Sequence, residues 1–132
     1  MNKTITILYW GARIIAALIL LQTLFFKFTA SEESVYIFTK VGMEPWGRIG
    51  IGVLELIAGG MLLINATAWL GAGLALGLMG GAIMMHLTQL GIEVQGDGGY
   101  LFILALAVAA CSLVVLALNK QKILALLKRG RR

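Results

Sequence analysis

Charged side chains make up only 13% of this 132-residue chain, and proline occurs once. Soluble domains carry roughly twice that share of charge and about 45–50% apolar residues. Here the apolar share is 60% and the mean hydropathy is +0.93. Because a small domain leaves much of its surface in contact with solvent, this composition predicts lipid as the solvent. We therefore expect a single-domain integral membrane protein.

Cysteine and histidine also occur only once each, as Cys111 and His86. One cysteine excludes an intrachain disulfide, a Cys-x-x-Cys redox pair and a cysteine-based metal cluster. It thereby excludes the four-helix quinone-linked thiol oxidoreductases, which need a cysteine pair. One histidine excludes a two-histidine haem within the chain, and no HExxH, GxSxG or phosphate-binding glycine loop is present. We expect no metal site.

The net charge of +5 arises largely at one end of the chain. Six of the eleven basic residues lie there: Lys120, Lys122, Lys128, Arg129, Arg131 and Arg132. A basic cluster beside an apolar span is typical of a cytoplasmic anchor to anionic lipid, at about 1 kcal/mol per residue. This arrangement does not favour nucleic-acid binding, and we expect no nucleic-acid partner.

Four apolar segments are long enough to cross a bilayer, which takes about 20 residues. They cover residues 4–28, 46–64, 68–90 and 100–118, and residues 119–132 form a basic cytoplasmic tail. The breaks at 65–67 and 91–99 are short, so consecutive spans must run in opposite directions. The predicted fold is an all-α membrane protein, an antiparallel bundle of four transmembrane helices.

The longer break at residues 29–45 has the pattern of a short amphipathic surface helix. A Thr-x-x-Glu capping box begins at Thr29, and Gly42 is placed to end a helix. Between these signals, apolar side chains recur at helical spacing, at Val35, Phe38 and Val41.

Basic residues in short loops predict the orientation. With four spans, both ends of the chain share one side, which carries Lys3 and the basic tail, while the opposite side carries Lys27, Lys40 and Arg48. Both termini are therefore expected in the cytoplasm. An alternative is a signal peptide, because residues 14–26 form a 13-residue apolar run. The bulky Phe28 before its cleavage position disfavours it.

Small residues repeat every four positions at Gly73, Gly77 and Gly81. Such a ridge lets helix backbones approach closely in lipid, where no hydrophobic force holds helices together. The ridge packs either within the chain, which we favour, or against a second copy in a homo-oligomer.

Ionisable residues inside the spans are the candidate functional residues, because each is costly there. Arg13 lies nine residues into the first span and Glu55 nine residues from the end of the second, so both are roughly 13 Å deep. We therefore predict an Arg13–Glu55 ion pair, since an unpaired charge at that depth is hard to sustain.

Three further residues extend this pair into a polar seam. Lys27 lies about 40° from the face of Arg13, and Arg48 about 20° from the face of Glu55, at 100° per residue. With His86 they form the outer mouth of a predicted ligand site, whereas Gln22 falls on the opposite face from Arg13 and is left out. Each of these residues also has an alternative interpretation. In it, Lys27 and Arg48 extend from the helix ends to the lipid headgroups, His86 forms a hydrogen bond with a backbone carbonyl, and the Arg13–Glu55 pair only determines which helices pack together.

These residues occur in an order that resembles the DoxX family of small bacterial membrane proteins. An arginine begins the first span and Lys27-Phe28 ends it, and residues 41–45 (VGMEP) are similar to the family's LG-x-P entry to helix two, with one residue more. Residues 50–60 (GIGVLELIAGG) resemble its glycine-rich helix with a central glutamate. Residues 82–86 (AIMMH), followed by Leu90-Gly91, resemble the end of helix three. The resemblance covers about residues 8–118.

The resemblance implies a four-helix fold in the bacterial cytoplasmic (inner) membrane and a link to redox systems. The family is named after subunits associated with a quinol oxidase. By position, the resemblance makes Arg13, Lys27, Glu55 and His86 the family-type polar residues, and it does not imply a particular cofactor. We expect an accessory protein, not an independent enzyme, that binds a small apolar or quinone-like ligand and serves a membrane redox partner.

Two alternatives belong to other classes of function. A small proton-coupled transporter would use Glu55 for proton exchange, although an arginine partner that keeps Glu55 ionised disfavours this. A structural assembly subunit would leave all chemistry to its partner protein.

Overall fold

A computed structural model describes residues 2–130 of the chain and is helical almost throughout. The elements in chain order are α1 (Lys3–Phe28), α2 (Glu32–Lys40), α3 (Trp46–Leu63), α4 (Ala68–Met85), the π-helical turn η1 (His86–Leu90), α5 (Tyr100–Leu118) and α6 (Lys120–Gly130). No strand occurs in the described range. The basic-tail residues Arg131 and Arg132 lie outside the described residues.

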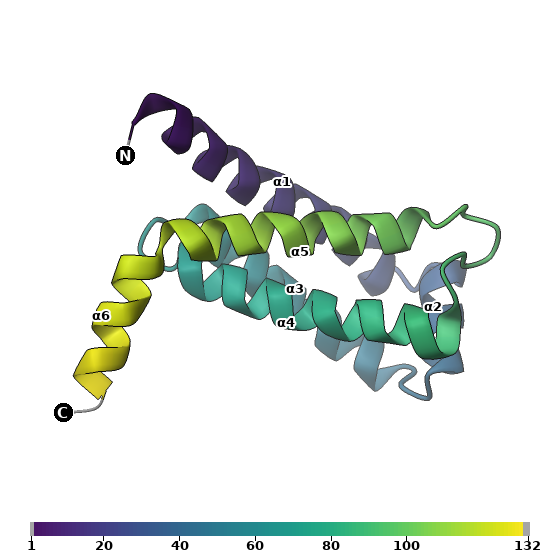
Figure 1. Cartoon of the computed structure of the whole chain (residues 1–132). Coiled ribbons are helices and arrows are strands. Elements are labelled where there is room, and N and C mark those ends of the chain that lie inside the picture. Colours follow the sequence, from purple (N-terminus) through teal and green to yellow (C-terminus); the bar gives the residue numbers. More distant parts are fainter. Residues whose placement is uncertain (1, 131–132) are drawn as a thin grey trace.

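Four helices are long and apolar enough to cross a membrane: α1, α3, α4 continued by η1, and α5. Their bounds agree with the expected spans to within one residue. Each packs against two others, α1 on α3, α3 on α4, α4 on α5 and α5 on α1, which closes a ring. The first and last described residues lie at one end of the ring, and α2 lies at the other end (Figure 1). The all-helical class with four such helices is confirmed.

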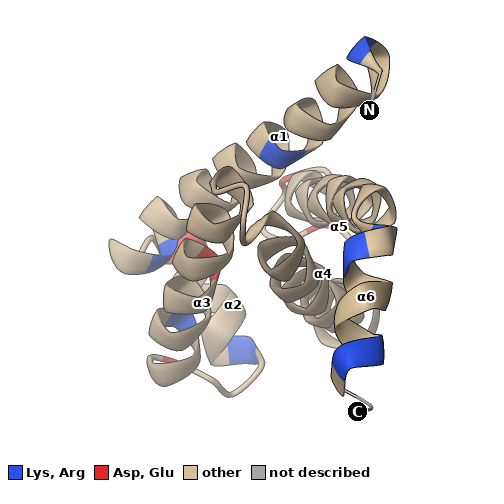
Figure 2. Ribbon diagram, turned by 90° about the vertical axis from the view of Figure 1, so that its left-hand side faces the viewer, with Lys and Arg blue, Asp and Glu red and all other residues tan. Residues whose placement is uncertain are grey.

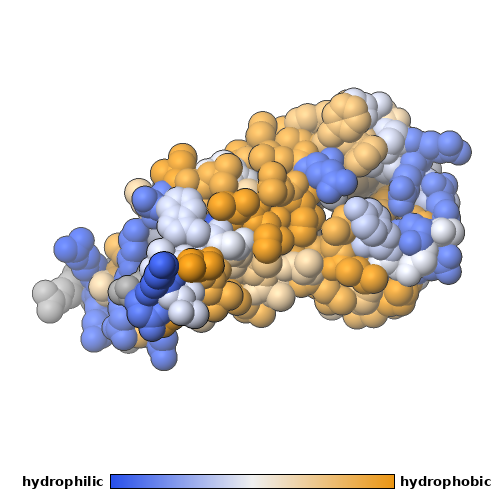
Figure 3. Space-filling model, turned by 90° about the horizontal axis from the view of Figure 1, so that it is seen from above, coloured by the Kyte–Doolittle hydropathy of each residue, from blue (hydrophilic) through white to orange (hydrophobic). Residues whose placement is uncertain are grey.

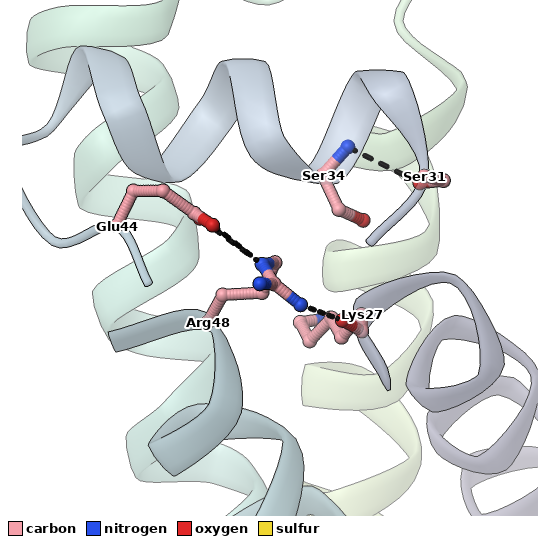
Figure 4. Close-up of polar contacts among 5 residues, drawn as sticks. All are labelled: Lys27, Ser31, Ser34, Glu44 and Arg48. Carbon is pink, nitrogen blue, oxygen red and sulfur yellow. Dashed lines mark hydrogen bonds and ion pairs between the residues drawn. The ribbon is translucent and has the colours of Figure 1, made fainter. Parts of the chain in front are cut away.

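Hydrogen bonds at the helix ends show why the chain breaks where it does. Asn2 Oδ1 accepts the Ile5 N–H at the start of α1. Ser31 Oγ accepts the Ser34 N–H at the start of α2 (Figure 4). The predicted cap at Thr29 is wrong, because the Thr29 hydroxyl donates backwards to a carbonyl at the end of α1. Gly42 follows α2 with a φ of 77°, a left-handed conformation that suits glycine and ends the helix as expected.

Many side chains in the interior of the bundle are small, with a few larger ones such as Leu20 and Leu62, and many large apolar side chains face outward. Ala16, Ala58 and Ala72 are completely buried. Large apolar side chains more than half exposed include Ile7, Leu18, Phe25, Ile103 and Leu113. Figure 3 shows hydrophobic residues around the middle of the molecule and hydrophilic ones towards its two ends. Small residues inside and large ones outside are expected where lipid replaces water around the helices.

One glycine marks the closest approach of two helices. A Cβ built on Gly71 of α4 would lie 2.8 Å from the Leu62 backbone nitrogen and 2.9 Å from the Ala58 carbonyl oxygen of α3. By contrast, a Cβ on Gly73, Gly77 or Gly81 meets nothing within 4 Å. We favoured packing of this glycine ridge against a helix of the same chain. That prediction is wrong, because no neighbouring atom lies close to Gly73, Gly77 or Gly81. The α3–α4 contact uses the opposite face of α4.

We predict that Gly71→Ala destabilises the bundle and that Gly80→Ala does not. The added methyl group at Gly71 must push α3 from α4, which costs about 1–3 kcal/mol. Gly80 is exposed with open space around it, so its variant should gain up to about 1 kcal/mol from helix propensity. Denaturant unfolding of both variants in the same detergent measures the difference. Equal stabilities would contradict the close α3–α4 contact.

Candidate functional site

A cavity of about 430 Å³ lies inside the bundle near the end covered by α2. All four long helices and α2 contribute to its walls, and most of the lining side chains are apolar. The inward face of the short helix, with Ile37 and Phe38, covers the end of the cavity. The volume lies in the range of small-molecule sites, about 300–1,000 Å³.

A buried ion pair lies on the wall formed by α1 and α3. Glu55 is 2% exposed, and its Oε1 is 3.0 Å from the Lys27 Nζ. Lys27 also donates to Oε2 at 3.3 Å, and the Thr23 hydroxyl donates to Oε2 at 3.0 Å. Lys27, Glu55 and Thr23 all line the cavity. The carboxylate is thus held by two side chains of α1, while the Lys27 ammonium remains accessible from the cavity.

The predicted Arg13–Glu55 pair is wrong. The Arg13 Nε donates to the Leu62 carbonyl at 2.6 Å, and its Nη1 donates to Asn65 Oδ1 at 2.9 Å. Its guanidinium also lies over the Trp10 ring, 3.8 Å from the centroid, a favourable cation–π contact. Arg13 is completely buried but does not line the cavity.

Unequal helix lengths explain this correction. α1 has 26 residues and α3 has 18, so α1 is longer by about 12 Å at 1.5 Å per residue. Its N-terminal part extends beyond the other helices (Figure 1). Arg13 therefore lies level with the C-terminal end of α3, where a cation stabilises the last carbonyl groups. Measuring the depth of each residue from the end of its own helix therefore placed Arg13 level with Glu55, deeper in the bundle than it lies.

Arg48 also lies outside the cavity, and it fastens the segments next to it. Its Nε donates to both carboxylate oxygens of Glu44, at 2.9 and 3.0 Å, and its Nη1 donates to the Lys27 carbonyl oxygen (Figure 4). The Arg48 side chain thus ties the start of α3 to the end of α1, next to Lys27. The contact holds the Lys27 backbone next to the start of α3.

His86 lines the cavity from the α4 side and is 5% exposed. Its Nδ1 lies 2.9 Å from the Gly91 carbonyl oxygen, and its ring meets the Phe102 ring edge-to-face at 5.5 Å. With the proton on Nδ1, this nitrogen donates to the carbonyl and leaves Nε2 as an acceptor. The carbonyl contact and the lining position, weighed as alternatives from sequence, therefore occur together. The π-helical turn begins at His86, and such turns are frequent at functional sites.

Two acidic residues lie at the α2 end of the site. Glu33 of α2 lines the cavity, and its Oε1 is buried without a hydrogen-bond partner among the described residues. Burial, together with the nearby Asp97 charge, raises the pKa of Glu33. Burial also acts to raise the pKa of Asp97, but three backbone hydrogen bonds, together with the electrostatic effect of the nearby His86 ring, outweigh it and lower that pKa. Asp97 organises the 91–99 connection by accepting the N–H groups of Val94, Gly99 and Leu101.

Sequence reasoning missed six polar lining residues: Gln22, Thr23, Ser31, Glu33, Ser34 and Tyr100. Gln22 was set aside because it faces away from Arg13, which proved to be the wrong reference residue. Thr23 lies one helical turn before Lys27, so the i, i+4 spacing from Lys27 could have found it. Gln22 and Tyr100 are exposed, and Figure 3 shows a hollow in the face that α1 and α5 form.

These features define a helical protein with four membrane-length helices around an apolar cavity that has a few polar groups on its wall. Within residues 2–130, no three His, Cys, Asp or Glu side chains come together as metal ligands. The chain matches no protein-family model, no curated protein and no solved structure.

We predict energetic coupling between Lys27 and Glu55 and none between Arg13 and Glu55. Glu55→Gln and Lys27→Met should each lower the free energy of unfolding by about 2–4 kcal/mol, because each leaves a buried charge without its partner. Their double variant should lose less than the sum, by about 1–3 kcal/mol. Arg13→Gln combined with Glu55→Gln should be additive. Additive losses for the Lys27 and Glu55 variants would refute the pair.

We predict that Asp97→Ala lowers the free energy of unfolding by about 1–2 kcal/mol, because three N–H groups lose their acceptor. The pKa of Asp97 is lowered in the folded state, so its contribution is complete above the unfolded pKa of about 3.9. It is then lost as the pH falls through the folded-state pKa. Wild type should therefore lose more stability than the variant in this acidic range. Glu93→Ala, at an exposed position of the same connection, is the control and should match wild type throughout.

Proposed function

We propose that this chain is a DoxX-type protein of the bacterial inner membrane that binds a small apolar molecule with a polar head, of the quinone type, in its cavity. It acts as an accessory to a membrane redox partner. The observation that carries the proposal is a 430 Å³ apolar cavity with the buried Lys27–Glu55 pair on its wall. The family assignment rests on the motif resemblance described above.

In this proposal the four long helices cross the membrane as an antiparallel bundle. Their outward-facing large apolar residues match a lipid environment. The end with Lys3 and α6 has more basic residues than the end with Lys27, Lys40 and Arg48, so both termini lie in the cytoplasm. The cavity then opens in the outer half of the membrane, with α2 over it.

The chemistry of the cavity wall supports a ligand with a carbonyl-type head. The Lys27 ammonium has three N–H donors, and its contacts with Glu55 leave it able to donate to a ligand oxygen. Gln22 and Tyr100, which also line the cavity, offer further donors. The remaining walls are apolar and suit a ring or an alkyl chain. A lipid-soluble ligand would enter from the bilayer through the hollow between α1 and α5 (Figure 3).

A proton-coupled transporter is the second candidate, and one observation favours it. Glu55 lines the cavity beside a lysine instead of an arginine, and lysine gives up its proton far more readily than arginine does. In that function, Glu55→Gln should abolish drug resistance conferred by the protein in cells. Unchanged resistance would exclude it.

We predict that short-chain quinones stabilise the purified protein and that Gly77→Leu abolishes this effect. At a quinone concentration 100-fold above Kd, the gain should be about 2.7 kcal/mol, seen as a higher melting temperature. Gly77 is exposed and lines the cavity, and nothing lies within 4 Å of its added Cβ. The Cβ of a leucine there meets no clash, and the rest of the side chain would occupy ligand space.

Gly73→Leu is the matched control, since Gly73 lies one turn earlier on the same face of α4 and does not line the cavity. It should keep quinone stabilisation. Native mass spectrometry of the wild type should show a lipid-soluble small molecule that Gly77→Leu lacks. The proposal fails if no quinone stabilises the wild type and no such molecule co-purifies. A stoichiometric protein that co-purifies in that case identifies an assembly subunit.

A further inference from the structure

The C-terminal helix α6 leaves the bundle and has no buried residue. Figure 1 shows it at a steep angle to α5, pointing away from the ring of four helices. If α5 crosses the membrane, a helix at this angle runs close to the membrane plane. This direction is a property of the fold that the basic composition of the tail did not reveal.

Hydrogen bonds fix the direction of α6 at its base. The Asn119 side-chain amide donates to the Val115 carbonyl at 2.8 Å and to the Tyr9 hydroxyl at 2.9 Å. Asn119 thereby ends α5 and ties the bend to α1. One turn later, Lys122 Nζ donates to the Ala66 carbonyl in the α3–α4 connection at 3.3 Å. The bend before α6 is thus held to α5 and α1 by Asn119, and the first turn of α6 is held to the α3–α4 connection by Lys122.

The remaining turns of α6 have two distinct faces. At 100° per residue, Ile123, Leu124, Leu126 and Leu127 fall within an arc of roughly 160°. The opposite arc carries Gln121, Lys122, Lys128 and Arg129, whereas Lys120, the first residue of α6, falls on the apolar side. The three leucines are all exposed, at 42%, 39% and 60% in chain order. This apolar face therefore has no partner within the described residues.

The charge of α6 is also unbalanced. The helix carries four basic residues and no acidic one, and the chain has no acidic residue after Asp97. Figure 2 shows these basic positions along the helix. No ion pair among residues 2–130 involves α6. The partner of this helix must therefore accept an apolar face and supply negative charge.

We propose that α6 lies in the interface of the leaflet that borders the ends of the chain and binds anionic phospholipid there. Its leucines enter the boundary of the acyl chains, and Lys128 and Arg129 bind lipid phosphates. Because α6 follows a membrane-length helix after one residue, it cannot avoid the headgroup region. The inference rests on the proposed membrane insertion and is independent of any ligand in the cavity.

The test places a fluorescent label on each face of α6 in the full-length protein. Cys111→Ala provides the background, and Leu127→Cys and Gln121→Cys provide the two sites. Each labelled protein is reconstituted into vesicles of phosphatidylcholine alone or mixed with phosphatidylglycerol. Brominated lipids then quench labels in the bilayer, and acrylamide quenches labels in water. Quenching of Trp10, Trp46 and Trp69 by brominated lipids reports insertion of the bundle separately.

In anionic vesicles, the label at 127 should be quenched by lipid and the label at 121 by acrylamide. In phosphatidylcholine alone, the protection at 127 should fall, as it should when the ionic strength rises from about 0.1 M to about 1 M. Lys128→Gln with Arg129→Gln should weaken the interaction of α6 with the anionic leaflet by about 25-fold, since each basic residue contributes about fivefold. Lys3→Gln, at the same end of the bundle, should have no effect.

Equal quenching at both sites in anionic vesicles with an inserted bundle would overturn the inference. So would protection at 127 that is independent of lipid charge, because anionic lipid would then not be the partner. Protection from acrylamide without quenching by brominated lipid would also overturn it, because that result indicates burial against protein, such as a second copy. Failure of the tryptophans to report insertion would instead contradict the proposed membrane topology.

Discussion

A carboxylate inside an apolar bundle needs a positive partner, and Glu55 imposes this requirement on the middle of α3. The cost of leaving such a charge unpaired is several kcal/mol. Lys27 meets the requirement because α1 is long enough to carry it past the level of Glu55 and let its side chain reach back into the bundle. Arg48 then holds the Lys27 backbone in place through its carbonyl oxygen. The pair therefore links the position of α1, the start of α3 and the wall of the cavity.

The bundle combines a tightly packed end with a hollow one. Near the ends of the chain, Ala58, Ala72 and Gly71 allow α3 and α4 to touch closely. Towards α2 the small residues Gly77 and Gly81 instead face the cavity and leave its space open. Packing at one end supplies the stability that lets the other end remain hollow. A stabilised scaffold beside an apolar cavity is the usual arrangement of a small-molecule site.

Hydropathy alone was sufficient for the four membrane-length helices, because the length of an apolar run is a local property, whereas the sequence did not predict the helix α6. The bounds of all four membrane-length helices agree with expectation. The prediction of an Arg13–Glu55 pair was wrong because the sequence does not show how far one helix is shifted along its axis relative to another. Tertiary contacts set this shift, such as the hydrogen bond from Arg13 to the Leu62 carbonyl. The predicted packing of the α4 glycine ridge was wrong for a related reason. The spacing of the glycines predicts a smooth helix face, but it does not show whether a helix or a cavity lies against that face. Lys27 and His86, which the sequence predicted at the mouth of the site, both line the cavity, and both lie near the ends of their helices that face α2.

An experimental structure of the protein extracted from its native membrane directly into lipid nanodiscs tests the central claim most directly. We expect non-protein density in the cavity, with its polar end within hydrogen-bonding distance of the Lys27 Nζ and the Lys27–Glu55 pair intact. A cavity closed by its own side chains, or Glu55 paired with Arg13, would contradict it.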